Sequence, residues 1–136
     1  MRLLLDTNIV VDIISKRDGY EDSLTVLKYC EIHQADGFVS ATTVTDMMYI
    51  LRKYIAPGAV RDAVRKLLSI VDVASVIKND ILSAFISGME DFEDAVQTSC
   101  AARIKADYIV TRNLKDFEGS TVPALSPAEV IKLLSV

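Results

Sequence analysis

Hydrophobic residues in this chain fall into short continuous runs that alternate with longer segments, in which they recur every three or four positions. The short runs predict buried strands at Leu3–Leu5, Phe38–Ser40, Ile70–Val76, Tyr108–Val110 and Val122–Leu125. The longer segments predict helices at Ile9–Ser15, Tyr20–Gln34, Thr42–Ile55, Ala59–Ser69, Lys78–Ser87 and Asp91–Lys105, and a last helix after Ser126 and Pro127. This alternation predicts an α/β fold, with a parallel sheet of four to five strands and helices on both faces.

Turn residues and helix caps set several of the expected boundaries. Thr42 or Thr43 is expected to cap the third helix, and Pro57 with Gly58 to end it. We find no repeat, linker or low-complexity segment, so residues 1–136 are expected to form a single domain.

The composition fits a domain of this size. The chain is long enough to bury a core without disulfides, and a hydrophobic content of 51% excludes a disordered chain. Cys30 and Cys100 are far apart, and neither a Cys-x-x-Cys pair nor a signal peptide is present, which favours a reducing, cytoplasmic setting. No apolar run approaches the ~20 residues that span a bilayer, so we expect no membrane segment.

Acidic residues stand where the expected strands end or the following helices begin. Asp6 ends the first strand, Asp46 lies just after the second, and Asp94 lies in the first turn of the helix that enters the fourth. Thr111, Asn113 and Asp116 directly follow that fourth strand. In a parallel sheet all these positions lie at the carboxyl edge, where open α/β sheets bind ligands.

A group of carboxylates without a basic partner requires a cation, because like charges a few ångströms apart repel one another. Ligands that offer only oxygen select Mg²⁺ or Mn²⁺ over zinc. Such an ion polarises a phosphodiester and activates water to attack phosphorus, which leaves 5′-phosphate and 3′-hydroxyl products. We therefore expect a divalent-metal nuclease. Its expected metal ligands and catalytic residues are Asp6, Asp46, Asp94 and Asp116, supported by Thr7, Asn8, Asp91, Thr111 and Asn113.

Each acid also has a purely structural interpretation. Asp6 can cap the helix at Ile9, Asp94 can satisfy a helix dipole as Asp91 does, and Asp116 can be a turn residue. Cys30 and His33, three apart, are interpreted as packing residues. A single histidine excludes a mechanism based on a histidine pair.

The formal net charge of −4 opposes binding to nucleic acid, although a bound metal would offset part of it. Most basic residues are interpreted as solvated, and some as candidates to line a groove. These candidates are Arg52, Lys53, Arg61, Arg65, Lys66, Arg103, Lys105, Arg112 and Lys115.

Four segments together resemble the successive motifs of the PIN-domain ribonucleases. They are Leu5-Asp6-Thr7-Asn8, Thr43-Val44-Thr45-Asp46, Asp91-Phe92-Glu93-Asp94-Ala95-Val96-Gln97 and Val110-Thr111-Arg112-Asn113-Leu114-Lys115-Asp116-Phe117. The resemblance implies a three-layer α/β/α sandwich and a Mg²⁺- or Mn²⁺-dependent endoribonuclease that acts on RNA. For small single-domain bacterial members it also implies the VapC-like toxin of a toxin–antitoxin pair, with a small antitoxin protein as partner.

Two positions depart from the family pattern. Asp46 stands where the family usually has glutamate, and Asn113 where relatives often have aspartate, which makes Asp116 the expected fourth acid. These departures favour, as an alternative, a catalytically weak or inactive PIN-like domain that binds RNA or protein. A phosphotransferase of the haloacid dehalogenase type, with Asp6 as nucleophile, ranks lower because Asn8 stands where that family needs an aspartate.

We also expect a homodimer. Ile50 and Tyr54, four residues apart, predict a second apolar stripe on the third helix that a partner covers. Self-association and an inhibitory helix are both open as occupants, and so is coverage by the following helix.

Overall fold

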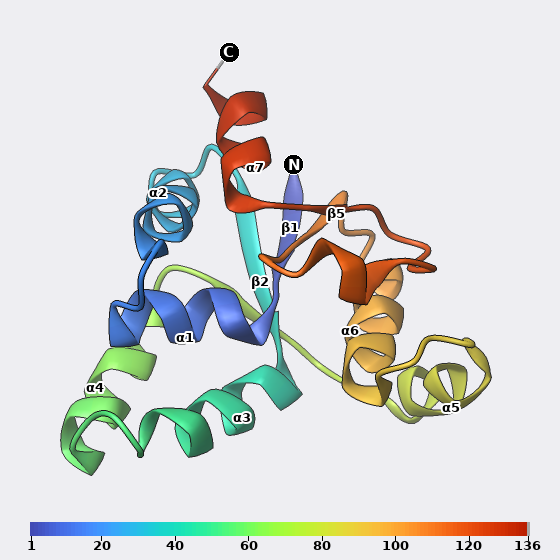
Figure 1. Cartoon of the computed structure of the whole chain (residues 1–136), viewed down its shortest axis with the longest axis horizontal. Coiled ribbons are helices and arrows are strands. Elements are labelled where there is room, and N and C mark those ends of the chain that lie inside the picture. The colour runs from blue at the N-terminus through green and yellow to red at the C-terminus, as the bar shows by residue number, and fades with distance from the viewer. Residues whose placement is uncertain (136) are drawn as a thin grey trace.

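The computed structural model describes residues 1–135, which form one parallel sheet between two sets of helices (Figure 1). The strands are β1 (Arg2–Leu5), β2 (Asp36–Ser40), β3 (Asp72–Ala74), β4 (Tyr108–Val110) and β5 (Ala124–Leu125). Their order across the sheet is β3-β2-β1-β4-β5, and every neighbouring pair is parallel. Along the chain, β2 and β3 are added on one side of β1. The chain then returns to place β4 and β5 on the other side, so the direction in which strands are added reverses at β1. Ligands bind outside the carboxyl ends of the strands at such a reversal.

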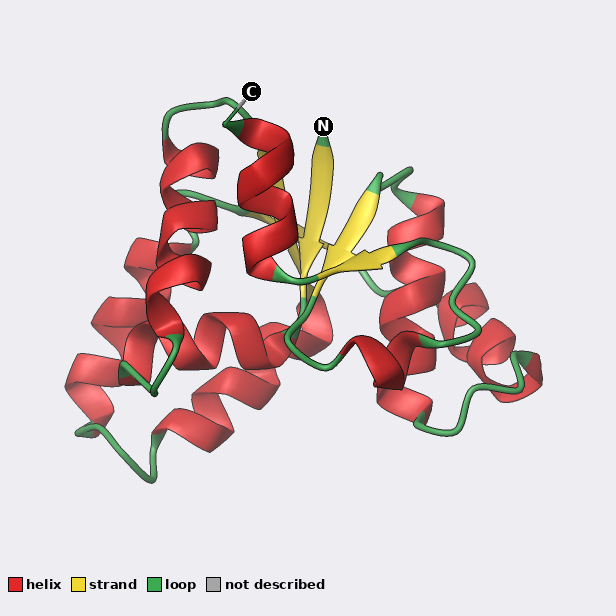
Figure 2. Ribbon diagram, turned by 45° about the horizontal axis from the view of Figure 1, so that its top comes forward, coloured by secondary structure: helices red, strands yellow, loops and turns green. Residues whose placement is uncertain are grey.

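Helices cover both faces of the sheet, as the alternation of strands and helices predicts. The helices are α1 (Thr7–Ser15), α2 (Tyr20–Glu31), α3 (Ala41–Leu51), α4 (Pro57–Leu67), α5 (Lys78–Ile86), α6 (Phe92–Arg103) and α7 (Pro127–Leu134), with a 3₁₀ turn at Leu114–Phe117. The two views agree that α1 to α4 and α7 lie on one side of the sheet and α5 and α6 on the other (Figure 1 and Figure 2). The three-layer α/β/α sandwich is therefore confirmed.

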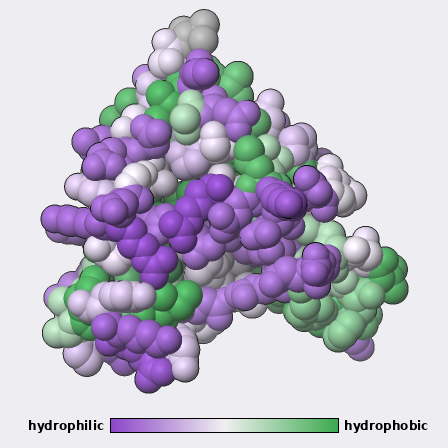
Figure 3. All heavy atoms as spheres, in the orientation of Figure 1, coloured by the Kyte–Doolittle hydropathy of each residue, from purple (hydrophilic) through white to green (hydrophobic). Residues whose placement is uncertain are grey.

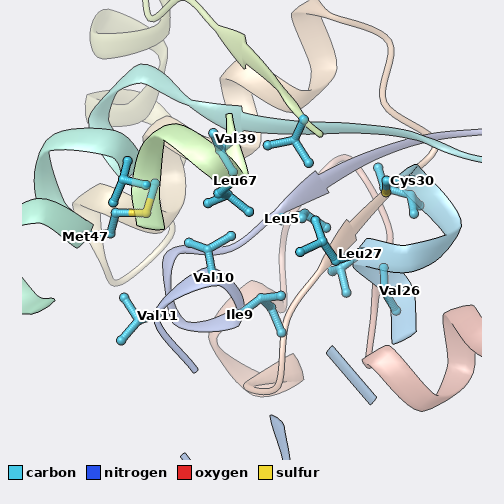
Figure 4. Packing of buried hydrophobic residues seen from close by; sticks show 14 of the residues in the cluster. Leu5, Ile9, Val10, Val11, Val26, Leu27, Cys30, Val39, Met47 and Leu67 are labelled. Atoms are coloured by element: carbon cyan, nitrogen blue, oxygen red, sulfur yellow. The ribbon is translucent and has the colours of Figure 1, made fainter. Parts of the chain in front are cut away.

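The central strand β1 shows why both faces need a cover. Successive side chains of a strand point to opposite faces, and Leu3 and Leu5 join one hydrophobic cluster while Leu4 joins another. The larger cluster fills the space under α1 to α4 and α7, and Figure 4 shows Leu5, Val10 and Met47 within it. A continuous apolar run is what a strand buried on both sides requires.

Several helix boundaries differ from the sequence prediction. Ser40, rather than Thr42 or Thr43, caps α3, because its hydroxyl accepts from the backbone nitrogen of Thr43 at 3.2 Å. Pro57 lies in the first turn of α4 instead of ending α3, since its fixed φ and missing N–H suit that position. The short chain between α3 and α4 forms turns, so α3 ends at Leu51 and not at Ile55.

Two strands are shorter than predicted. Ile70 and Val71 continue the end of α4, with their backbone nitrogens donating to the carbonyl of Leu67 at 2.9 and 3.1 Å, so β3 begins only at Asp72. β5 keeps only Ala124 and Leu125. The β-branched residues Ile70, Val71 and Val122 favour a strand by their side chains, so the prediction included them although their backbones do not pair in the sheet.

Cys30 is a packing residue, as its position in a helix indicates. It lies in the main cluster (Figure 4), and a Cβ added to Gly37 on β2 would lie 2.8 Å from its sulfur. Glycine at position 37 thus allows the close approach of α2 to the sheet. Burial raises the pKa of the Cys30 thiol to about 11, so the thiol stays protonated at neutral pH.

The surface is uneven in polarity. Leu82, Phe85 and Ile86 on α5 are exposed, and Phe85 packs on Phe92 with ring centroids 4.7 Å apart. Figure 3 shows hydrophobic residues gathered over α5, at the lower right, while polar residues cover much of the middle of this face. Among residues 1–135, no helix has the length and apolar character needed to cross a bilayer.

The expected apolar stripe on α3 is not formed. Ile50 is partly buried against the main cluster, whereas Tyr54 is exposed and its hydroxyl accepts from Arg17 at 3.2 Å. One of the two residues is thus largely covered by the domain itself, and the other is paired with a cation.

Candidate active site

A pocket of about 370 Å³ opens at the carboxyl edge of the sheet, between the second half of α3 and the start of α6. It brings together most of the residues that the sequence predicts for the site. They are Asp6, Thr7, Asn8, Asp46, Asp91, Asp94 and Asp116, and they are joined by Tyr49, Ile50, Glu93 and Gln97. Thr111 and Asn113 do not line the pocket but lie behind it.

Asp6 is the best-defined acid of the pocket. It occupies the N-cap position of α1, yet its side chain makes no capping bond. Its Oδ1 accepts from the Nε2 of Gln97 at 3.0 Å, and its Oδ2 accepts from the hydroxyl of Thr111 at 2.9 Å. Asp6 is only 4% exposed, so these bonds fix a buried carboxylate at the base of the pocket. Asp6 therefore stands at the cap position, but its side chain bonds to Gln97 and Thr111 instead of capping the helix.

A row of hydroxyl groups supports Asp6 and its neighbour. The hydroxyl of Thr7 lies 2.9 Å from that of Thr43, which in turn bonds to Ser40. On the other side, the backbone nitrogen of Asn113 donates to the hydroxyl of Thr111 at 3.0 Å. Thr111 and Asn113 thus orient Asp6, one through its side chain and the other through its backbone.

Asp91 and Asp94 divide two roles at the start of α6. Asp91 caps the helix, because its Oδ1 accepts from the backbone nitrogen of Asp94 at 3.0 Å. This contact leaves the carboxylate of Asp94 facing the pocket rather than the helix end. Asp91 therefore supports the site by fixing the first turn from which Asp94 projects.

The acids of the pocket influence one another electrostatically. Burial, and then the charges of Asp91, Asp6 and Asp116, raise the pKa of Asp94 to about 7. Burial also raises the pKa of Asp6, against the opposing effect of the bonds from Gln97 and Thr111, and it raises the pKa of Asp46. These shifts are expected where carboxylates share a poorly solvated site without a positive charge.

Three arginines of the chain pair with acids outside the pocket. Within residues 1–135, salt bridges join Arg17 and Arg112 to Asp12 and Arg103 to Asp80, and none of them includes an acid of the pocket. Arg103 and Arg112, which the sequence offered as groove residues, are thus held by buried acids instead. Asp12 anchors Arg112 at 3.2 Å and so ties the segment between Thr111 and Asn113 to α1.

The donor set suits a hard divalent cation, because the pocket offers carboxylate oxygens and no neutralising side chain. In the described part of the chain, however, no three histidine, cysteine or acidic side chains are already gathered closely enough to hold a metal ion. Asp6 is fixed by its two bonds, whereas Asp116 is exposed on the 3₁₀ turn. The residues fit such an ion by their chemistry and by their common pocket.

Sequence reasoning missed Gln97, the main partner of Asp6. Gln97 is 1% exposed, and its Oε1 is buried without a hydrogen-bond partner among the described residues. One signal was present, since Gln97 follows Asp94 by three positions and therefore lies on the same face of α6. It is also a long polar residue among small buried ones such as Ala95, Val96 and Ala101.

The fold and the pocket define an α/β domain with an acidic site at the carboxyl edge of a parallel sheet. Residues 2–115 match the PIN domain family. Because this match extends over most of the chain, the protein belongs to the PIN domain family.

Solved structures with the same fold include toxins of the VapC type. VapBC2 from Rickettsia felis, bound to a DNA fragment from their promoter, aligns over 93% of this chain and 98% of its own, with a TM-score of 0.72 and 19% identity. A toxin–antitoxin complex from Klebsiella pneumoniae aligns over 92% and 97%, with a TM-score of 0.70 and 23% identity. VapC20 from Mycobacterium tuberculosis, a toxin that cleaves the sarcin–ricin loop, aligns over 79% and 86%, with a TM-score of 0.60 and 13% identity. No curated protein sequence matches this chain.

Proposed function

We propose that this protein is a Mg²⁺- or Mn²⁺-dependent endoribonuclease that hydrolyses RNA phosphodiesters. The observation that carries the proposal is Asp6, a buried carboxylate held by two neutral donors in a pocket that five further acids line. Membership of the PIN domain family supports the same activity, since a structural relative is a toxin that cleaves the sarcin–ricin loop.

In this proposal Asp6, Asp94, Asp46 and Asp116 would hold the ion. When bound, the ion supplies Lewis-acid activation of the phosphodiester and of water. Gln97 and Thr111 fix the plane of the Asp6 carboxylate before substrate arrives, and the cap by Asp91 fixes the backbone of Asp94. Preorganised ligands of this kind raise rates because they need not reorganise during the reaction.

We further propose that the protein is the toxin of a toxin–antitoxin pair. The structural relatives from Rickettsia felis and Klebsiella pneumoniae were solved as such complexes, which supports a small antitoxin as partner. The homodimer also stays a prediction, and sedimentation of the purified chain, alone and with a small protein encoded beside it, tests both assemblies.

Cleavage of a panel of structured RNAs, in Mn²⁺ and in EDTA, tests the proposed activity. We expect Asp6→Asn and Asp94→Asn to lower the rate at least about 100-fold, because each removes a charged ligand from a site that depends on geometry. Asp62→Asn is the matched control, since Asp62 is an exposed acid on α4 that lies outside the pocket. Cleavage by Asp6→Asn at the wild-type rate would refute the assignment.

A PIN-like domain that binds without cutting is the second candidate function. It is favoured by one observation, namely that no three acids within residues 1–135 are gathered closely enough to hold a metal ion. Binding of RNA or of a partner protein, without cleavage in either Mn²⁺ or Mg²⁺, would identify this second function.

A further inference from the structure

An exposed aromatic ring stands at the rim of the acidic pocket. Tyr49 is 58% exposed and lines the pocket from α3, one helical turn after Asp46. The guanidinium carbon of Arg52 lies 3.9 Å from the centre of the Tyr49 ring, and its Nε donates to the carbonyl of Tyr49 at 3.1 Å. The Lys53 ammonium lies 5.9 Å from the same ring. We call these three residues, Tyr49, Arg52 and Lys53, the Tyr49 platform.

A second pair of an exposed tyrosine and a cation includes Tyr54, which lies shortly after the end of α3. Tyr54 is 60% exposed, with the guanidinium carbon of Arg17 lying 5.3 Å from the centre of its ring. Two exposed tyrosines therefore each have a cation against the ring. Of the two, Tyr49 is the one that lines the acidic pocket.

The two sides of the pocket thus differ in charge. The start of α6 and the 3₁₀ turn contribute Asp91, Glu93, Asp94 and Asp116, whereas α3 contributes one acid, Asp46, together with Tyr49. Arg52 and Lys53 stand against the ring of Tyr49, outside the pocket lining. A polyanion that approaches the acids is repelled unless cations next to them offset the repulsion. The α3 side, where Arg52 and Lys53 stand beside Tyr49, is therefore the more favourable path for a phosphate chain that reaches the pocket.

Aromatic rings and guanidinium groups have a further property in common. Both present flat faces on which unpaired bases stack without regard to sequence, and nearby cations contact the phosphates between those bases. Bases inside a duplex are not available for such stacking. The chemistry of the platform therefore selects a single-stranded stretch of nucleic acid.

We infer that the Tyr49 platform binds a single-stranded segment of the RNA substrate next to the phosphate that is cut. One base stacks on the Tyr49 and Arg52 pair, and Arg52 and Lys53 contact the flanking phosphates. This inference rests on the proposed function, which supplies RNA as the substrate. It assigns the binding of a base and its flanking phosphates to the end of α3 and the two residues after it. The acids of the pocket cannot perform this role.

Binding measured without catalysis tests the inference. Anisotropy of a labelled 12-nucleotide single-stranded RNA is followed in EDTA, with Asp6→Asn as the parent protein so that the probe stays intact. We expect Tyr49→Ala to raise the Kd about 10-fold and Tyr49→Phe to change it little, because a phenyl ring still stacks. The same RNA annealed into a duplex is expected to bind more weakly than the single strand.

The dependence of Kd on salt separates the ring from the cations. Loss of one phosphate contact lowers the slope of log Kd against log salt by about 0.7 on a single strand. We expect Arg52→Gln and Lys53→Gln to lower the slope in this way, whereas Tyr49→Ala leaves it unchanged. Lys28→Gln is the matched control, since Lys28 is an exposed lysine on α2 away from the pocket.

Other outcomes overturn the inference and leave the proposed activity to its own test. A parent protein that does not bind the single strand, or variants of the platform that bind it like the parent, would overturn it. So would variants that keep RNA binding but lose a co-encoded small protein, since the platform would then be a protein interface. Loss of RNA binding in these variants supports the platform even if wild-type protein cuts no RNA. Thermal melting confirms that each exposed substitution leaves the fold intact.

Discussion

Two buried aspartates of this molecule, Asp80 and Asp6, have very different partners. Asp80 on α5 is 1% exposed, and Arg103 contacts both of its oxygens at 3.2 to 3.3 Å. Asp80 also accepts from the backbone nitrogen of Ile77, at the start of its own helix, at 3.0 Å. Asp6 is 4% exposed, and its side-chain partners among residues 1–135 are the neutral donors Gln97 and Thr111.

The difference separates acids that serve the fold from acids that serve the site. The chain supplies the counter-charge for Asp80 through Arg103, and for Asp12 through Arg112 and Arg17. Among residues 1–135 no salt bridge supplies one for Asp6, although five further acids share its pocket. A buried charge needs a partner, so this contrast supports the proposal that a cation binds at Asp6.

The largest predicted effect is on the free energy of unfolding, when Asp80 and Asp6 are each replaced by asparagine in separate variants. Asp80→Asn should lower the free energy of unfolding by about 2 kcal/mol, because charged hydrogen bonds to Arg103 and the helix start are weakened. Asp6→Asn should leave the stability of the metal-free protein unchanged or raise it, since it relieves repulsion. Urea unfolding measures both. A loss of stability in Asp6→Asn as large as that in Asp80→Asn would show that Asp6 is a structural acid.

Replacing the positioning side chain is expected to have a smaller effect. Gln97→Met keeps the volume but removes the donor to Asp6, so we expect the rate of RNA cleavage to fall about 10-fold. Gln97→Glu adds another carboxyl group to a pocket that six acids already line, and it should reduce the rate further. Single-turnover assays with saturating RNA give these rates, and Thr45→Val, at an exposed position of α3, is the control. Full activity in Gln97→Met would mean that the bond does not orient Asp6.

The smallest of the predicted effects is the change in the stability of the metal-free protein with pH. The pKa of Asp94 is raised to about 7, whereas an unfolded aspartate titrates near 3.8. Between these values the folded protein binds more protons than the unfolded chain, so the stability of metal-free protein should fall as pH rises from 4 to 7 and then level off. In Asp94→Asn this slope should be reduced. A wild-type slope that persists in Asp94→Asn would assign it to other groups.

The strands and the first acids were predictable because they follow from local patterns. A short apolar run that ends in Asp6 gives both β1 and the edge of the sheet, and β4 was predicted with its observed bounds, Tyr108–Val110. The start of α6 gave Asp94 in the same way. These features depend on burial and on the topology of parallel strands.

Contacts between distant segments were not predictable in the same way. Gln97 and Asp6 are 91 positions apart, so no local pattern joins them before the fold is known. The cap of α3 was placed on a threonine because Ser40, Thr42 and Thr43 can all cap, and only the geometry at the end of β2 selects Ser40. The role of Arg112 could not be predicted either, since its partner Asp12 lies on α1, far away in the sequence.

Binding of Mn²⁺ by isothermal titration calorimetry tests most directly whether the pocket of Asp6 needs a cation. The wild-type protein, Asp6→Asn and the control Asp62→Asn are titrated at a pH above 7, where the carboxyl group of Asp94 is ionised. We expect the wild type and Asp62→Asn to bind the ion alike, and Asp6→Asn to bind it at least about 10-fold more weakly, because one charged ligand is lost. Equal binding by Asp6→Asn and the wild type, or no binding by either, would contradict the assignment of the pocket as a metal site.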